Sequence, residues 1–162
     1  MSLDLEEFTR QPRLTDGAWG TLLERTGLPS GMPPDLWNVE NPEAIEEIAR
    51  SYVEAGSEII LTNTFSTNRY ALDRHGASDR VQELARAGAA ISQRAGGDTA
   101  RVFGSIGPTG KVVMMEEINR DDFLSAFREA CMGLSAAGVD AIVLETFNEL
   151  EELTLALQAV RE

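Results

Sequence analysis

Polar and acidic side chains follow hydrophobic runs at four places along the 162-residue chain. Asp16 ends a short run from Arg13, and Thr62, Asn63 and Thr64 follow the aliphatic run 59–61. Ser105 lies near the end of a third run, and Glu145 ends a fourth. Hydroxyls, an amide and two carboxylates can orient a small polar ligand that carries an ammonium group. Glycines nearby would let backbone N–H groups approach a carboxylate, so the set suits an α-amino acid: Gly17, Gly20, Gly107 and Gly110.

Each of these side chains also has a purely structural explanation. Thr62 and Thr64 could cap the turn that follows their strand, and Asp16 could form an Asx-turn with the nearby backbone. Glu145 could pair with an arginine on a neighbouring loop. The residues alone leave both explanations open.

Other reactive residues indicate little chemistry. His75 is the only histidine and lies in a polar connection, which favours a surface position, and Cys131 falls on the apolar face of a predicted helix. Lys111 is the only lysine and follows its strand in a loop, so a Schiff-base aldolase is disfavoured. The segment 104–111 is not a P-loop, because that motif needs Ser or Thr where Val112 stands. We predict no catalytic residue and no metal ligand in this chain.

Hydrophobic periodicity predicts the elements that position these residues. Apolar residues recur at helical spacing in four segments, and short apolar runs separate them. Asn41 is a candidate N-cap for the first of these helices, with Pro42 at its first position. Residues 1–12 form a leader segment or a short helix. The predicted strands are 13–16, 58–62, 101–106 and 139–144, and the predicted helices are 42–55, 78–95, 121–137 and 149–160.

The order of these elements predicts an α/β fold. Parallel strands with helical crossovers connect such strand–helix units economically, and eight units make a (β/α)₈ barrel. The fold class is therefore a parallel (βα)₄ half of a TIM barrel, with a small doubly wound sheet as the alternative. A half barrel leaves strand edges unpaired and one sheet face uncovered. We expect a longer protein or a partner to complete it.

Composition narrows the class of protein. Hydrophobic residues make up 43% and charged residues 25%, which is ordinary for a globular domain. The net charge of −13 argues against nucleic acid and anionic membranes as partners. No apolar run approaches the roughly 20 residues that span a bilayer. One cysteine permits no internal disulfide, which favours a cytoplasmic location.

Five segments in order resemble the homocysteine S-methyltransferase family. That family includes the homocysteine-binding barrel of cobalamin-dependent methionine synthase, and betaine–homocysteine methyltransferase. The resemblance runs from Arg13 to Arg161. It is carried by Asp16-Gly17-Ala18-Trp19-Gly20-Thr21, Tyr52-Val53-Glu54-Ala55-Gly56, Leu61-Thr62-Asn63-Thr64-Phe65, Gly104-Ser105-Ile106-Gly107-Pro108-Thr109-Gly110, and Gly138-Val139-Asp140 through Glu145-Thr146-Phe147.

The resemblance implies a barrel in which a zinc-bound homocysteine thiolate attacks an activated methyl group and becomes methionine. By position, Asp16 and Glu145 would hold the substrate ammonium. Gly17 and the turn Thr62, Asn63, Thr64 and Phe65 would line the amino-acid pocket, with Ser105 on the same rim and Gly107 at its floor. Zinc would keep the thiol, whose free pKa is about 8.5, as a thiolate.

The chain departs from the family in one large respect. The family's zinc ligands are cysteines after the sixth strand and at the eighth, and this sequence contains none of them. Residues 1–162 therefore resemble the N-terminal half of such an enzyme, and the methyl donor, corrinoid or folate, stays open. One alternative is a non-catalytic half-barrel that dimerises or docks on a partner. Another is a barrel enzyme for a phosphorylated substrate, which would need a phosphate site near strands seven and eight.

Overall fold

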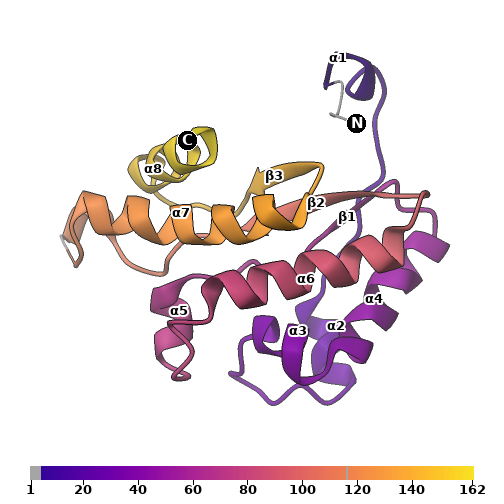
Figure 1. Ribbon diagram of the computed structural model, residues 1–162, viewed down its shortest axis with the longest axis horizontal. Coiled ribbons are helices and arrows are strands. Elements are labelled where there is room, and N and C mark those ends of the chain that lie inside the picture. Colours follow the sequence, from indigo (N-terminus) through magenta and orange to yellow (C-terminus); the bar gives the residue numbers. More distant parts are fainter. Residues whose placement is uncertain (1–4, 116) are drawn as a thin grey trace.

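Three parallel strands form the sheet of the protein, which a computed structural model describes over residues 5–115 and 117–162 (Figure 1). The strands β1 (Ile59–Leu61), β2 (Arg101–Ile106) and β3 (Ala141–Leu144) lie side by side in chain order. β1 pairs with the first half of β2, and β3 pairs with its second half. Because the strands are parallel, their carboxyl ends all point to one edge of the sheet.

Four long helices accompany the strands. α4 (Pro42–Glu54) precedes β1, α6 (Val81–Gly96) joins β1 to β2, α7 (Arg120–Ala137) joins β2 to β3, and α8 (Leu150–Arg161) follows β3. α6 packs between α4 and α7, and α8 packs on α7 (Figure 1). α6 also contacts β1 and β2, and α8 contacts β3. The helices therefore form a layer on one face of the sheet. None of the helices in the described ranges is long and apolar enough to cross a membrane.

The core lies between that helix layer and the sheet. Leu84 of α6 and Phe123, Phe127 and Leu134 of α7 are almost completely buried in one cluster. Gly104 of β2 faces Leu134, and a Cβ atom there would lie 2.8 Å from the leucine side chain. This glycine lets β2 and α7 approach closely, so the helix layer fits tightly over the middle strand.

The opposite face of the sheet is less covered. Leu61, Phe103 and Val143 alternate with the core residues and are half-buried. The ring of Phe8, at the end of α1 (Leu5–Phe8), packs 5.9 Å from the ring of Phe103. The Arg13 guanidinium lies 5.1 Å from the centre of the Phe8 ring. The N-terminal segment thus shields part of this face.

Short helices occupy the connections. Asn68 Oδ1 accepts hydrogen bonds from the backbone N–H groups of Tyr70 and Ala71 and so caps the short helix α5. These helices are α2 (Gly20–Arg25), η1 (Pro34–Leu36), α3 (Trp37–Glu40), α5 (Arg69–Asp73) and η2 (Val113–Met115).

The structure confirms the α/β class and the parallel order, and its long helices begin and end within three residues of the predicted bounds. The predicted strand 13–16 was wrong, because it is reduced to a single bridge between Thr15 and Ile59. The Leu61 backbone N–H donates to the Asp16 carboxylate. If the strand had continued, this N–H would have donated to its next backbone carbonyl instead. Asn41 occupies the predicted N-cap position of α4, with Pro42 as the first residue of the helix, but its side chain makes no cap hydrogen bond. Residues 1–4 of the predicted leader lie outside the described residues.

Candidate functional site

A cleft of about 300 Å³ opens at the carboxyl edge of the sheet. Six of the residues predicted for the site line it: Gly17, Thr62, Asn63, Phe65, Ser105 and Glu145. Seven further residues complete the lining: Ala18, Trp19, Gly20, Pro34, Asp35, Leu61 and Ser66. The lining comes from segments up to 128 positions apart in the sequence (Gly17 and Glu145), so the fold builds the cleft from connections that follow each strand.

Asp16 lies beside the cleft with one carboxylate oxygen fully used. Its Oδ2 accepts hydrogen bonds from Trp19 Nε1 at 2.8 Å and from the Leu61 backbone N–H at 2.9 Å. Burial raises the pKa of Asp16, these two hydrogen bonds lower it, and the negative charge of Glu145 raises it again. The negative charge of Glu145 therefore reaches Asp16, and a cation bound near both carboxylates would relieve this repulsion.

Glu145 is oriented by Ser105. The Ser105 hydroxyl donates a hydrogen bond of 2.5 Å to Glu145 Oε1, and the Glu145 backbone N–H donates to the Ile106 carbonyl at 3.1 Å. Among the described residues, no arginine or lysine lies within ion-pair distance of this carboxylate. The predicted alternative, an arginine partner for Glu145, is therefore absent from the described part of the chain.

The Thr62 and Thr64 side chains link the end of β1 to β2 by hydrogen bonds. Thr64 Oγ1 donates to the Ser105 carbonyl at 2.7 Å, so its single proton is used there. Thr62 must then donate in the 2.5 Å contact between the two hydroxyls, and Thr62 Oγ1 accepts the Ser105 N–H at 3.0 Å. The relay fixes the backbone of Ser105 on both sides. Thr64 lies behind the cleft wall and does not line it.

The amide of Asn63 holds the proline-rich connection before α4. Its Nδ2 donates to the Pro34 carbonyl and to Asn38 Oδ1, both at 2.9 Å. Asn38 in turn donates to the carbonyls of Asn63 and Leu84, at 2.8 and 3.2 Å. The sequence pattern missed Asn38. Only its place inside an apolar stretch, where a buried amide needs partners, could have drawn attention to it.

Phe65 and Gly107 contact each other directly. The Gly107 N–H donates to the Phe65 carbonyl at 3.0 Å, and a Cβ atom on Gly107 would overlap the Phe65 ring. Gly17 approaches Tyr52 in a similar way, because a Cβ there would lie 3.2 Å from the tyrosine hydroxyl. Gly107 does not line the cleft itself, so its predicted contribution comes through Phe65.

Asp35 is a third acidic residue at the cleft, and sequence reasoning missed it. Its side chain is 2% exposed, and Oδ1 accepts hydrogen bonds from Thr67 Oγ1 at 2.5 Å and from the Ser66 N–H at 3.1 Å. Burial raises its pKa to about 6, although both hydrogen bonds oppose that shift. The contacts attach η1 to the turn after Phe65. The motif Pro34-Asp35 looks like an ordinary turn in the sequence, which is why no signal marked it.

The remaining reactive residues lie away from the cleft. Cys131 is 7% exposed in the core, where burial raises its pKa to about 11, and His75 lies exposed after α5. Lys111 lies 3.9 Å from Glu117 in the loop beyond β2. No group of three or more His, Cys, Asp or Glu side chains in the described ranges could hold a metal ion. These residues therefore do not fit a zinc site.

The fold and the cleft together define an α/β protein with an acidic, hydroxyl-rich pocket at the carboxyl edge of a parallel sheet. A profile of the homocysteine S-methyltransferase family matches residues 13–162. The chain belongs to this family, as the resemblance of its five segments predicts.

Two methionine synthases are similar to the chain in sequence. The protein from Mycobacterium tuberculosis is 30% identical and that from Mycobacterium leprae 28% identical, each over 169 residues. Both alignments cover 97% of this chain and 14% of the relative, so the chain spans about one-seventh of the length of these relatives.

A solved structure shares the fold. The metallated form of the homocysteine methyltransferase MmuM from Escherichia coli superimposes with a TM-score of 0.80 at 23% identity. The match covers 97% of this chain and 62% of that chain.

Proposed function

We propose that this chain is the amino-acid-binding half of an enzyme that transfers a methyl group to the thiolate of homocysteine and so forms methionine. Family membership supports the reaction class. The observation that carries the proposal is that two acids meet at one cleft: Glu145 lines it, and the Asp16 carboxylate is hydrogen-bonded to the lining residues Trp19 and Leu61. Two carboxylates without a cationic partner form a site for an ammonium group.

The proposed roles follow from the contacts. Asp16 and Glu145 hold the substrate ammonium, and Ser105 orients Glu145 by its hydrogen bond. Gly17 and Phe65 line the pocket, and Gly107 supports the Phe65 ring from below. The turn residues Thr62, Asn63 and Thr64 keep these groups in place, since their side chains are committed to the protein.

We further infer that the sheet is half of a (β/α)₈ barrel. The Thr15 bridge and the three strands follow one another in chain order, as successive barrel strands do, and the helices pack on one face. The missing C-terminal half would supply strands beside β3. Zinc, when bound in the intact enzyme, would keep the homocysteine thiol deprotonated, with ligands from outside this chain. A cytoplasmic location and a corrinoid or folate methyl donor belong to the same proposal as expectations.

Calorimetric titration of the 162-residue chain with L-homocysteine tests the proposal. Glu145→Ala should weaken binding by about 1–3 kcal/mol, because it removes a charged partner of the ammonium. Glu151→Ala is a matched control, since that glutamate is exposed on α8 and pairs with Arg120. Equal affinity of the wild type and Glu145→Ala would remove Glu145 from the site. We also expect no methyl transfer and no stoichiometric zinc with this chain alone.

A half-barrel that associates with a second copy is the other candidate function. The half-buried face with Leu61, Phe103 and Val143 favours it, because such a face gains from being covered. The mass in solution separates the two: a stable dimer that does not bind homocysteine would favour the second candidate.

A further inference from the structure

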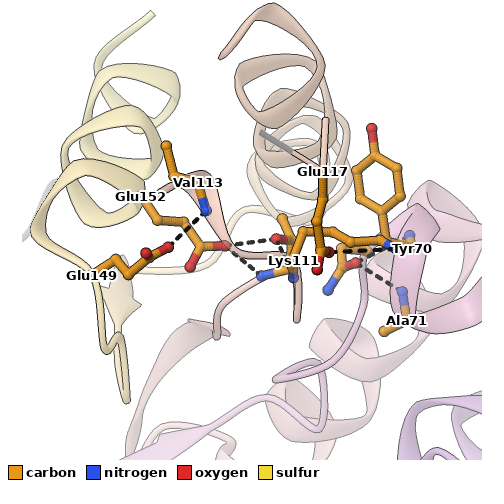
Figure 2. A network of polar contacts seen from close by, with 9 residues as sticks. Tyr70, Ala71, Lys111, Val113, Glu117, Glu149 and Glu152 are labelled. Carbon is orange, nitrogen blue, oxygen red and sulfur yellow. Dashed lines mark hydrogen bonds and ion pairs between the residues drawn. The ribbon is translucent and has the colours of Figure 1, made fainter. Parts of the chain in front are cut away.

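A buried carboxylate outside the cleft has no part in the proposed ligand set. Glu152 on α8 is 3% exposed, and its Oε1 accepts hydrogen bonds from the backbone N–H of Thr109 at 2.8 Å and from the Thr109 hydroxyl at 2.7 Å. Three residues earlier, Glu149 Oε2 accepts the Val113 N–H at 2.8 Å. Figure 2 shows Glu152 of α8 and Glu149, which directly precedes α8, pointing toward the loop that follows β2. Hydrogen bonds from two positions of the loop, Thr109 and Val113, therefore attach residues 107–113 to the start of α8.

The same loop is fastened on its other side to the segment that follows β1. Its first residue, Gly107, donates to the Phe65 carbonyl at 3.0 Å. Asn68 Nδ2 donates to the Pro108 carbonyl at 3.4 Å, while Asn68 Oδ1 caps α5. The loop thus lies between the exits of β1 and β3 and contacts both.

Hydrogen bonds at two places join the segment that ends β2 to the segment that follows β3. Near the strands, Ser105 donates to Glu145. Farther out, Thr109 donates to Glu152 through both its backbone and its hydroxyl. The segments 105–109 and 145–152 therefore form a closed frame, in which a shift of α8 against the loop would change the position of Glu145 relative to Ser105.

Thr146 shows that the backbone of this frame is strained. Its φ is +62°, and it is the only non-glycine residue with positive φ in the described part of the chain. A β-branched residue avoids this left-handed conformation, which persists only where the surroundings impose it. Thr146 lies directly between Glu145, whose carboxylate accepts the Ser105 hydrogen bond, and α8. Glu149 and Glu152 attach the start of α8 to the loop 107–113 by hydrogen bonds.

We propose that Glu152 is a positioning residue for the cleft: by fixing Thr109 against α8, it sets the hydrogen bond between Ser105 and Glu145. Glu152 acts through the loop and does not line the cleft. The value of that hydrogen bond for substrate binding rests on the proposed function. The positioning itself is a property of the folded chain and can be measured without substrate.

Amide hydrogen exchange of the 162-residue chain by NMR tests the proposal. The informative amides are those of Gly107 and Glu145, which donate to the Phe65 and Ile106 carbonyls. Neither of these hydrogen bonds involves a substituted side chain. In Glu152→Ala both should exchange at least about tenfold faster, as expected for local opening. The amide of Thr62, which donates to Phe103 across β1 and β2, should keep its rate.

Three further variants sharpen the result. Glu151→Ala removes the neighbouring exposed glutamate and should change none of these rates, and Glu152→Gln keeps an acceptor oxygen and should restore most of the protection. If Glu152→Ala does not fold, Thr109→Val keeps the backbone bond to Glu152 and removes the hydroxyl, which donates to Glu152 and accepts the Lys111 N–H at 3.2 Å. This variant should show the same pattern with a smaller rise. Unchanged rates at Gly107 and Glu145, or an equal rise at Thr62, would overturn the positioning role.

Homocysteine titration of the same proteins separates this inference from the proposed function. Weaker binding by Glu152→Ala than by Glu151→Ala would support both. If the wild type does not bind homocysteine, the proposed function fails for this chain, whereas the exchange rates still decide whether Glu152 positions Glu145.

Discussion

The Ser105 hydroxyl lies 2.5 Å from Oε1 of Glu145, so the residue that precedes the end of β2 orients the acid that follows β3. Ser105 is itself fixed on both sides of its backbone by Thr62 and Thr64. One chain of hydrogen bonds therefore runs from the end of β1 through β2 to the carboxylate. The acid at the far side of the cleft, Asp16, is held separately by Trp19 and Leu61.

The indole of Trp19 should control the ionisation of Asp16. Burial raises the pKa of Asp16, and the hydrogen bond from Trp19 lowers it. Trp19→Phe should therefore raise that pKa further, measured by NMR titration of the aspartate carboxyl carbons. Tyr52→Phe is the control, since the Tyr52 hydroxyl donates to the Ala18 carbonyl and not to Asp16. A lower or unchanged pKa in Trp19→Phe would contradict the assigned contact.

Asp35 should make the stability of the chain depend on pH. Its pKa is about 6 in the folded protein, above the ordinary value of 3.8, so its favourable contribution is present below about pH 4 and is lost as the pH rises through 6. Asp35→Asn removes this dependence. The difference in unfolding free energy between Asp35→Asn and the wild type should shift in favour of the variant by about 2 kcal/mol between about pH 4 and about pH 7.5.

Urea unfolding at a series of pH values measures that shift. Asp79→Asn changes an exposed aspartate and should leave the pH profile of the wild type unaltered. Parallel profiles for Asp35→Asn and the wild type would mean that Asp35 ionises as freely in the folded chain as in the unfolded one.

Gly107 should tolerate no side chain. Gly107→Ala places a methyl group in the Phe65 ring and should cost about 1–3 kcal/mol of unfolding free energy, since a packed ring must move. Gly20→Ala is the matched control, because no atom lies within 4 Å of its added Cβ and Gly20 begins α2. That change should stabilise the chain by up to about 1 kcal/mol. Equal stabilities of the two variants would refute the contact with Phe65.

Cys131 should be unreactive in the folded chain. Burial raises its pKa from 9.0 to about 11, so the thiolate fraction near neutral pH falls about a hundredfold, and the side chain is also only 7% exposed. Alkylation by iodoacetamide should be at least about a hundredfold slower in buffer than in urea. Similar rates in both conditions would show that α7 opens readily at this position.

Sequence periodicity predicted most of the fold and failed at one strand. The helices α4, α6, α7 and α8 follow apolar repeats that local spacing defines, so their bounds were close. The segment 13–16 was wrong because the side chain of Asp16 takes the hydrogen bond that would have extended the strand. No local pattern distinguishes an acid that pairs with a distant backbone from one that merely ends a strand.

The sequence by itself determined which family the chain resembles, and it placed Ser105 at the end of one parallel strand and Glu145 directly after another. It could do so because the apolar spacing that defines these elements is local. Only the tertiary structure decided that the Thr62 and Thr64 hydroxyls bond to each other and to the Ser105 backbone, and that Asp35 and Glu152 are buried. The partners of these side chains lie between 2 and 43 positions away. Whether a hydroxyl or carboxylate faces a ligand or its own backbone depends on such distant partners, which spacing along the chain does not encode.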